Sequence, residues 1–175
     1  MVSLRLATDF ADAMRVHAQI RDLDRYYPQF DDWWRGTVIP GLSEAGRHAL
    51  ILAEEGGDLA GVAVVKAGAD ENKIRCLRVM PEWRRQGLAG HLIERSLKHL
   101  QHDKPVISVA PEMMGGLSPV LVNSFAFALT RVVPGNYRPG IPEYWFNDYK
   151  GSKPQPLFAR RELLEIARQP SQNIP

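Results

Sequence analysis

A basic, glycine-containing turn lies where a strand pattern gives way to a helix pattern. Its residues are Arg84-Arg85-Gln86-Gly87-Leu88-Ala89-Gly90. The start of a helix leaves backbone N–H groups unpaired and carries a partial positive charge. Gly87 and Ala89 have little bulk, so an anion can approach those N–H groups, and Arg84 and Arg85 can add charge-assisted bonds. Residues 84–90 therefore predict a phosphate-binding turn.

Three strands in a meander must precede this turn. Residues 49–53 and 59–66 are apolar runs joined by the hairpin sequence Glu55-Gly56-Gly57-Asp58. Residues 73–80 form the next strand and lead into the turn. From about Gln86 to Leu100, apolar residues recur at helical spacing, which predicts an amphipathic helix that begins inside the turn.

The flanking segments complete a mixed fold. Alternation predicts a first strand over residues 2–6, and Thr8 or Asp9 can cap a helix that runs to about Ile20. A second helix is expected near Phe30–Leu42. After the phosphate-binding turn we expect a strand, a helix and a last strand over residues 106–109, 119–131 and 143–147. The fold class is α/β (α+β): a mixed, mostly antiparallel sheet of six to seven strands with helices on both faces.

Length and composition suit one domain with a short extension. The chain has 175 residues and a net charge of +2, which is too small to indicate a nucleic-acid-binding protein. From residue 150 onward the balance is about +3, so the body is near neutral. We expect a domain over residues 1–150 and a basic C-terminal extension over 151–175 with a short helix at 157–168. Cys76 is the only cysteine, and no apolar run is long enough to span a bilayer, so we expect a cytoplasmic protein.

The spacing within the turn separates it from other phosphate motifs. A Gly-Lys-Ser/Thr sequence is absent, and G-x-G-x-x-G is not formed by Gly87 and Gly90. The pattern is V-x-P-x-x-R-x-x-G-x-A, from Val79 to Ala89. It resembles the acyl-CoA-binding motif of the GNAT superfamily of N-acyltransferases, and the order of elements agrees over residues 2 to 149.

The resemblance implies acetyl-CoA as co-substrate and an amine as acceptor. Pantetheine would pair with the backbone of the motif strand, and the thioester would enter a V-shaped gap between splayed parallel strands, at residues 77–80 and 106–109. Backbone N–H groups near Leu77–Val79 would stabilise the oxyanion. The implied cofactor-binding residues are Leu77, Val79, Arg84, Arg85, Gln86, Gly87, Leu88, Ala89, Gly90 and Asn123.

The resemblance leaves the general acid and base open. The family pattern N-x-x-A-x-x-L-Y is matched from Asn123 onward, with Thr130 in place of the tyrosine. Water or Tyr137 can supply the proton instead, or catalysis is weak. Glu112 is the first candidate base, Glu143 and Glu71 follow, and a water chain is the alternative. The histidines show no metal-ligand spacing, so no metal is expected.

Aromatic and polar residues are the candidates for acceptor binding: Tyr26, Tyr27, Trp33 and Arg138. Packing of a helix pair is the alternative for the aromatic group, and a rigid connection is the alternative for residues 137–143. The leading hypothesis is an N-acetyltransferase acting on a primary amine of a small molecule or protein. An acyl-CoA sensor with little turnover and a toxin that acetylates aminoacyl-tRNA are the alternatives, and a homodimer stays open.

Overall fold

The computed structural model describes residues 1–43 and 47–149, which fall into two units that meet in sequence at Pro105 and Val106. The C-terminal extension, with the helix predicted at 157–168, lies outside the described residues. Within them, no helix combines the length and the apolar character needed to cross a bilayer.

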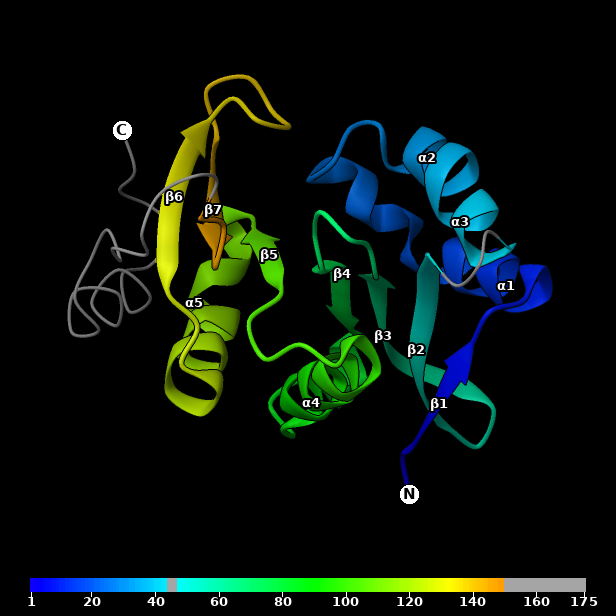
Figure 1. Cartoon of the computed structure of the whole chain (residues 1–175). Coiled ribbons are helices and arrows are strands. Elements are labelled where there is room, and N and C mark those ends of the chain that lie inside the picture. The colour runs from blue at the N-terminus through cyan, green and yellow to red at the C-terminus, as the bar shows by residue number, and fades with distance from the viewer. Residues whose placement is uncertain (44–46, 150–175) are drawn as a thin grey trace. The chain divides into compact units, whose positions relative to one another are not determined.

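The first unit contains an antiparallel sheet in the order β1-β2-β3-β4 (Figure 1). Its strands are β1 (Ser3–Ala7), β2 (His48–Glu55), β3 (Asp58–Lys66) and β4 (Lys73–Val79). Gly56 and Gly57 join β2 to β3 with φ angles of 61° and 95°, as a two-residue hairpin turn with both φ positive requires. The predicted meander and its first strand are confirmed.

Short helices cover one face of this sheet. They are α1 (Phe10–Ile20), η1 (Arg21–Arg25), α2 (Phe30–Trp33), η2 (Trp34–Val38) and α3 (Ile39–Ser43). Asp9 caps α1 by accepting a 2.8 Å hydrogen bond from the backbone N–H of Asp12. The helix predicted near Phe30–Leu42 is confirmed as the run from α2 to α3. Apolar residues of these helices and of β2 and β3 form one buried cluster, called here the helix-face core: Val16, Ile20, Phe30, Trp34, Val38, Leu50, Leu52, Val62 and Val64, with further residues.

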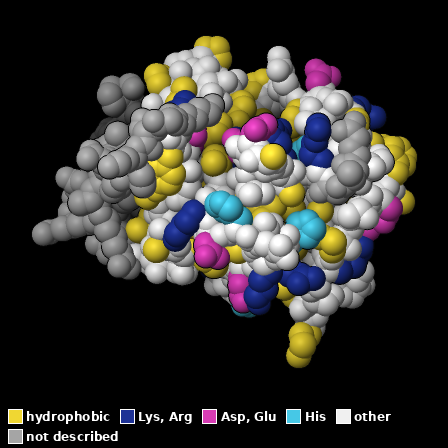
Figure 2. Space-filling model, viewed as in Figure 1, with side chains coloured by type: hydrophobic (Ala, Val, Ile, Leu, Met, Phe, Trp, Pro, Cys, Tyr) yellow, Lys and Arg dark blue, Asp and Glu magenta, His cyan; other side chains and the backbone are white. Residues whose placement is uncertain are grey.

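The other sheet face carries α4 (Leu88–Leu100), which follows the short helix η3 (Pro81–Trp83). Leu92 and Ile93 of α4 are fully buried. At Gly61 of β3, a side chain would stand 2.9 Å from the Arg78 carbonyl oxygen and 3.0 Å from Leu92, so only glycine fits between β4 and α4. The solvent face of α4 carries acidic, basic and histidine side chains together, as Figure 2 shows over this helix.

An ion-pair network ties α1 to the sheet edge. Asp12 accepts two 2.6 Å bonds from Arg5 and one 2.9 Å bond from Arg15. Arg5 also donates to Glu54 at 2.6 Å, and Arg15 forms an ion pair with the same carboxylate. These arginines hold the pKa values of Asp12 and Glu54 below their ordinary values.

Asp12→Asn should lower the free energy of unfolding by about 1 kcal/mol at pH 7, because the pairs are partly exposed. A carboxyl group whose pKa is lower in the folded state stabilises the fold above its unfolded pKa, near 4, and loses that effect as the pH falls further. The difference in the free energy of unfolding between wild type and Asp12→Asn should therefore shrink below about pH 4. Urea denaturation at several pH values measures it, and a difference that grows on acidification would contradict this account.

The second unit has an antiparallel sheet in the order β5-β7-β6, with one long helical segment. Its elements are β5 (Val106–Val109), α5 (Pro111–Pro119), η4 (Val120–Ser124), β6 (Leu129–Pro134) and β7 (Pro142–Phe146). The strands predicted at 106–109 and 143–147 are confirmed to within a residue. Buried apolar side chains fill this unit: Ile107, Val109, Leu121, Phe127, Leu129 and Phe146.

The helix predicted over residues 119–131 is wrong. The helical segment starts eight residues earlier, at Pro111, and ends at Ser124. Ala126 has φ +50° and the Phe127 N–H bonds back to the Leu121 carbonyl, which turns the chain out of the helix. Residues 129–134, rich in Thr and Val, instead form β6, since such β-branched residues suit a strand.

Thr130 therefore does not occupy a helical position equivalent to the family tyrosine. It lies where β6 and β7 shift register, in a bulge, and is buried. Its hydroxyl donates to the Trp145 carbonyl and accepts from the Asp148 N–H, both at 3.0 Å. Thr130 holds two chain segments together, and the absence of tyrosine there says nothing about the general acid.

Candidate functional site

The turn at residues 84–90, which is predicted to bind phosphate, has a backbone shape that gathers N–H groups. Arg85 and Gly87 both adopt left-handed conformations, with φ angles of 60° and 80°. Such alternation within three residues makes a concave run of N–H groups that suits an anion. Left-handed φ favours glycine, which explains Gly87, whereas Arg85 carries strain of the kind that collects at binding sites.

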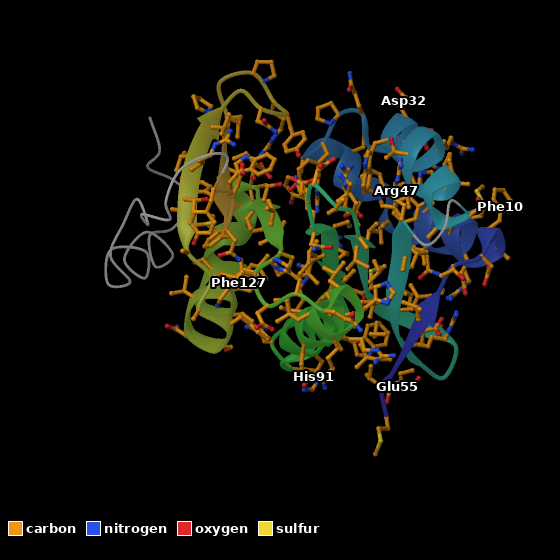
Figure 3. The ribbon with its side chains drawn as sticks, in the orientation of Figure 1. Phe10, Asp32, Arg47, Glu55, His91 and Phe127 are labelled. Carbon is orange, nitrogen blue, oxygen red and sulfur yellow. The ribbon has the colours of Figure 1, made fainter. Side chains whose placement is uncertain are left out.

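The start of α4 adds further donors to this concave run. Gly87 is the N-cap residue, and the first helical bond is the 3.3 Å contact from the His91 N–H to the Gly87 carbonyl. The N–H groups of residues 88–90 precede that bond and so have no partner inside the helix. A side chain at Gly87 would meet no described atom within 4 Å, so the space beside this residue is open. His91, labelled in Figure 3, marks the first turn of α4.

Two side chains of the turn hold it against the end of β4 and against η3. Arg84 Nε donates to the Val79 carbonyl at 3.2 Å, and Gln86 Nε2 donates to the Glu82 carbonyl at 3.0 Å. Both side chains belong to exposed residues. The Arg84 guanidinium is therefore fixed beside the turn, where it adds positive charge to the N–H groups.

The hydrogen bonding of β4 shows which of its N–H groups face away from β3. The Met80 N–H donates to the Ala60 carbonyl at 2.9 Å, toward β3. Because successive residues of a strand direct their N–H groups to opposite edges, those of Leu77 and Val79 point to the edge away from β3. These are the two residues that the resemblance assigns to pantetheine.

The helix-side face of β4 carries Cys76, Arg78 and Met80. Cys76 and Met80 pack against the helix-face core. Burial raises the pKa of the Cys76 thiol to about 12, so the thiol stays protonated at neutral pH and is a poor nucleophile. Cys76 is therefore a packing residue.

Arg78 is buried and donates to Asp22 of η1 at 2.7 Å. Sequence patterns gave no signal for this pair, since 56 residues separate its members. The only sign of this pair in the sequence is an arginine at a strand position whose neighbours on the same face are apolar.

The aromatic segment belongs largely to packing. Trp34 is fully buried, its Nε1 donates to the Ala13 carbonyl at 3.2 Å, and its ring stacks on His17 at 5.7 Å between centroids. Tyr26, Tyr27 and Trp33, the predicted acceptor-binding residues, are only partly buried against the helix-face core. They are the members of the segment that keep exposed surface, and their role in binding an acceptor stays a prediction.

The second unit brings two predicted site residues together. Arg138 donates to both carboxylate oxygens of Glu112, at 2.7 and 2.9 Å, and so ties the loop before β7 to the first turn of α5. Tyr137, next to Arg138, is 40% exposed, whereas Glu143 is 3% exposed. Asn123 lies in η4, whereas Thr130 lies in β6.

The described residues contain no group of three or more His, Cys, Asp or Glu side chains arranged to hold a metal ion.

A model of the acetyltransferase (GNAT) family matches residues 6–110, more than half of the chain. The chain therefore belongs to the GNAT acetyltransferase family, a class of acyltransferases, as the motif predicted. A comparison with curated proteins finds no match.

Solved structures share the fold. A GNAT-family protein from Desulfovibrio desulfuricans has a TM-score of 0.67 at 16% identity, over 83% of this chain and 97% of its own. The ribosomal-protein-S18-alanine N-acetyltransferase from Escherichia coli scores 0.62 at 15% identity, over 83% and 92%. A GNAT acetyltransferase from Elizabethkingia anophelis with acetyl-CoA bound scores 0.52 at 16% identity, over 83% and 95%. These likenesses confirm the predicted fold class.

Proposed function

We propose that the protein moves an acetyl group from acetyl-CoA to a primary amine, by direct attack while both are bound. The observation that carries the proposal is the open, concave run of N–H groups at residues 85–90, formed by two left-handed residues before α4. Its form suits a pyrophosphate, whose charged oxygens need several donors at short range. The solved relative with acetyl-CoA bound supports this choice of donor.

The remaining contacts follow from the strand that leads into the turn. The N–H groups of Leu77 and Val79, which point away from β3, would pair with pantetheine and hold the thioester beside β4. When bound, acetyl-CoA supplies an activated carbonyl. A strand N–H near the reacting carbon would stabilise the oxyanion that forms during attack. Arg84, Arg85 and Asn123 remain the proposed polar side-chain contacts to CoA.

Tyr137 is the best candidate for the acid that protonates the leaving thiolate. It is an exposed phenol, a type of group that can donate a proton in general acid catalysis. Glu112 is less suited to act as the base, because a bidentate ion pair with the Arg138 guanidinium engages both of its oxygens. We propose that the Glu112–Arg138 pair fixes the loop that carries Tyr137. Glu143, Glu71 or a water chain remain as the base.

Turnover tests the proposal directly. Thiol release from acetyl-CoA would be followed with spermidine, L-lysine and a peptide with a free N-terminal alanine, alongside calorimetric titration with acetyl-CoA. We expect acetyl-CoA to bind and at least one amine to be acetylated, at a rate well above hydrolysis. Binding without turnover on any amine would favour the acyl-CoA sensor, and activity confined to aminoacyl-tRNA would favour the toxin.

A further inference from the structure

The motif strand carries a buried charged residue on its apolar, helix-side face. Arg78 lies between Cys76 and Met80, on a face where both neighbours pack into an apolar core. It is 7% exposed, and its buried Nε donates to no partner among residues 1–43 and 47–149. Burial of a guanidinium with an unused donor costs free energy, and an apolar residue of similar size is often no less stable. Arg78 therefore serves something other than stability.

The structure identifies what Arg78 holds. Its Nη2 lies 2.7 Å from Oδ2 of Asp22, and Arg25 Nη2 lies 3.3 Å from the same oxygen. Both pairs end on Oδ2, so Oδ1 of Asp22 accepts no hydrogen bond within the described part of the chain. The Asp22 side chain is 42% exposed and that of Arg78 is 8% exposed. The Arg78 guanidinium is therefore shielded from solvent, whereas the Asp22 carboxylate is accessible to it.

The position of this carboxylate matters because of the strand to which it is bound. Arg78 stands between Leu77 and Val79, whose backbone the proposed function assigns to the pantetheine arm. Asp22 comes from η1, on the helix side of the same strand. A carboxylate bonded to Arg78 is thus held on the helix side of the strand segment along which the thioester would run.

The free oxygen of Asp22 suits a cation. The Arg25 guanidinium lies over the Tyr26 ring, 4.7 Å from its centroid, and its contact with Asp22 is on Oδ2, so Oδ1 is left for another positive group. An alkyl amine is protonated at neutral pH, since lysine has an ordinary pKa of about 10.4. A free carboxylate oxygen is the natural partner of that ammonium group.

We propose that Asp22 binds an ammonium group of the acceptor through Oδ1, and that Arg78 is the residue that positions Asp22. Where that group is the one acetylated, it passes its proton to the base before the neutral amine attacks. The acceptor is then a cationic alkyl amine. This inference rests on the proposed function, which it deepens by naming the acceptor class and a binding residue.

The test compares Asp22→Asn with Asp24→Asn, which changes an exposed carboxylate on the same turn. The KM for the best amine of spermidine, L-lysine and the alanine-terminated peptide would be measured beside the KM for acetyl-CoA and the melting temperature. Asp22→Asn should raise the amine KM by about tenfold or more and leave the acetyl-CoA KM within about twofold. Asp24→Asn should match wild type, and Asp22→Glu should recover part of the loss.

A second variant separates binding from folding. Arg78→Met should leave the melting temperature close to that of wild type, because it removes a buried guanidinium with an unused donor and the Asp22 carboxylate that remains is partly exposed to solvent. It should still raise the amine KM, since Asp22 loses its anchor.

An unchanged amine KM in Asp22→Asn overturns the inference. So does an equal rise in both KM values together with a lower melting temperature, because that marks a structural role. If wild type binds acetyl-CoA but acetylates no amine, the proposed function fails and this inference fails with it.

Discussion

Gly87→Trp should abolish acetyl-CoA binding while the fold persists. A side chain at residue 87 meets no described atom within 4 Å, so the indole fits beside the turn, where it would compete with the pyrophosphate for the N–H groups of residues 85–90. We expect the Kd to rise by about 100-fold or more, which corresponds to roughly 3 kcal/mol. The left-handed backbone at residue 87 should cost about 1–2 kcal/mol of stability, and calorimetric titration measures the loss of affinity.

Gly116→Trp is the matched control for that variant. Gly116 is an exposed residue of α5 that also has open space around it, and its φ is not positive. The Gly116→Trp variant should bind acetyl-CoA with the affinity of wild type. Undiminished binding by Gly87→Trp would show that the phosphate-binding turn has been assigned to the wrong ligand.

Trp34→Ala should lower the free energy of unfolding by about 4 kcal/mol, the largest stability loss that we expect for a single site. Trp34 is fully buried among Phe30, Trp33 and His17, with centroid distances of 5.7 to 6.0 Å. Its removal leaves a cavity and takes away the bond to the Ala13 carbonyl. Urea denaturation followed by circular dichroism measures the loss.

Trp33→Ala gives the comparison, because Trp33 is only partly buried. It should cost less than half as much, about 1–2 kcal/mol. Equal losses of unfolding free energy in the two variants would mean that Trp33 and Trp34 do not differ in their contribution to packing. A nearly neutral Trp34→Ala would contradict the assignment of the buried part of this segment to packing.

Local signals predicted most of the first unit. Gly56-Gly57 between two apolar runs defined a hairpin, and the spacing of Leu88, Leu92 and Leu100 defined α4, because local geometry decides both. Gly87 and the helix start that follows it were also predictable, whereas the left-handed backbone at Arg85 was not. That this turn binds phosphate stays a prediction. These elements need no knowledge of distant residues.

The second unit shows where such reasoning fails. Residues 119–131 match a helical pattern, yet Ala126 turns the chain and residues 129–134 pair with β7. Strand pairing is a tertiary effect that outweighs a weak local preference. The pairs Asp22–Arg78 and Glu112–Arg138 were equally hidden, because they join residues 56 and 26 positions apart.

The central claim is that backbone N–H groups of residues 85–90 bind the pyrophosphate of acetyl-CoA. It is tested most directly by titrating acetyl-CoA into ¹⁵N-labelled protein and following the backbone amide resonances. We predict that the largest shifts fall on Gln86 to Gly90, that Leu77 and Val79 shift as well, and that acetylpantetheine, which lacks the pyrophosphate, leaves residues 86–90 unmoved. Saturable binding that leaves the amides of Gln86 to Gly90 unshifted would contradict the claim.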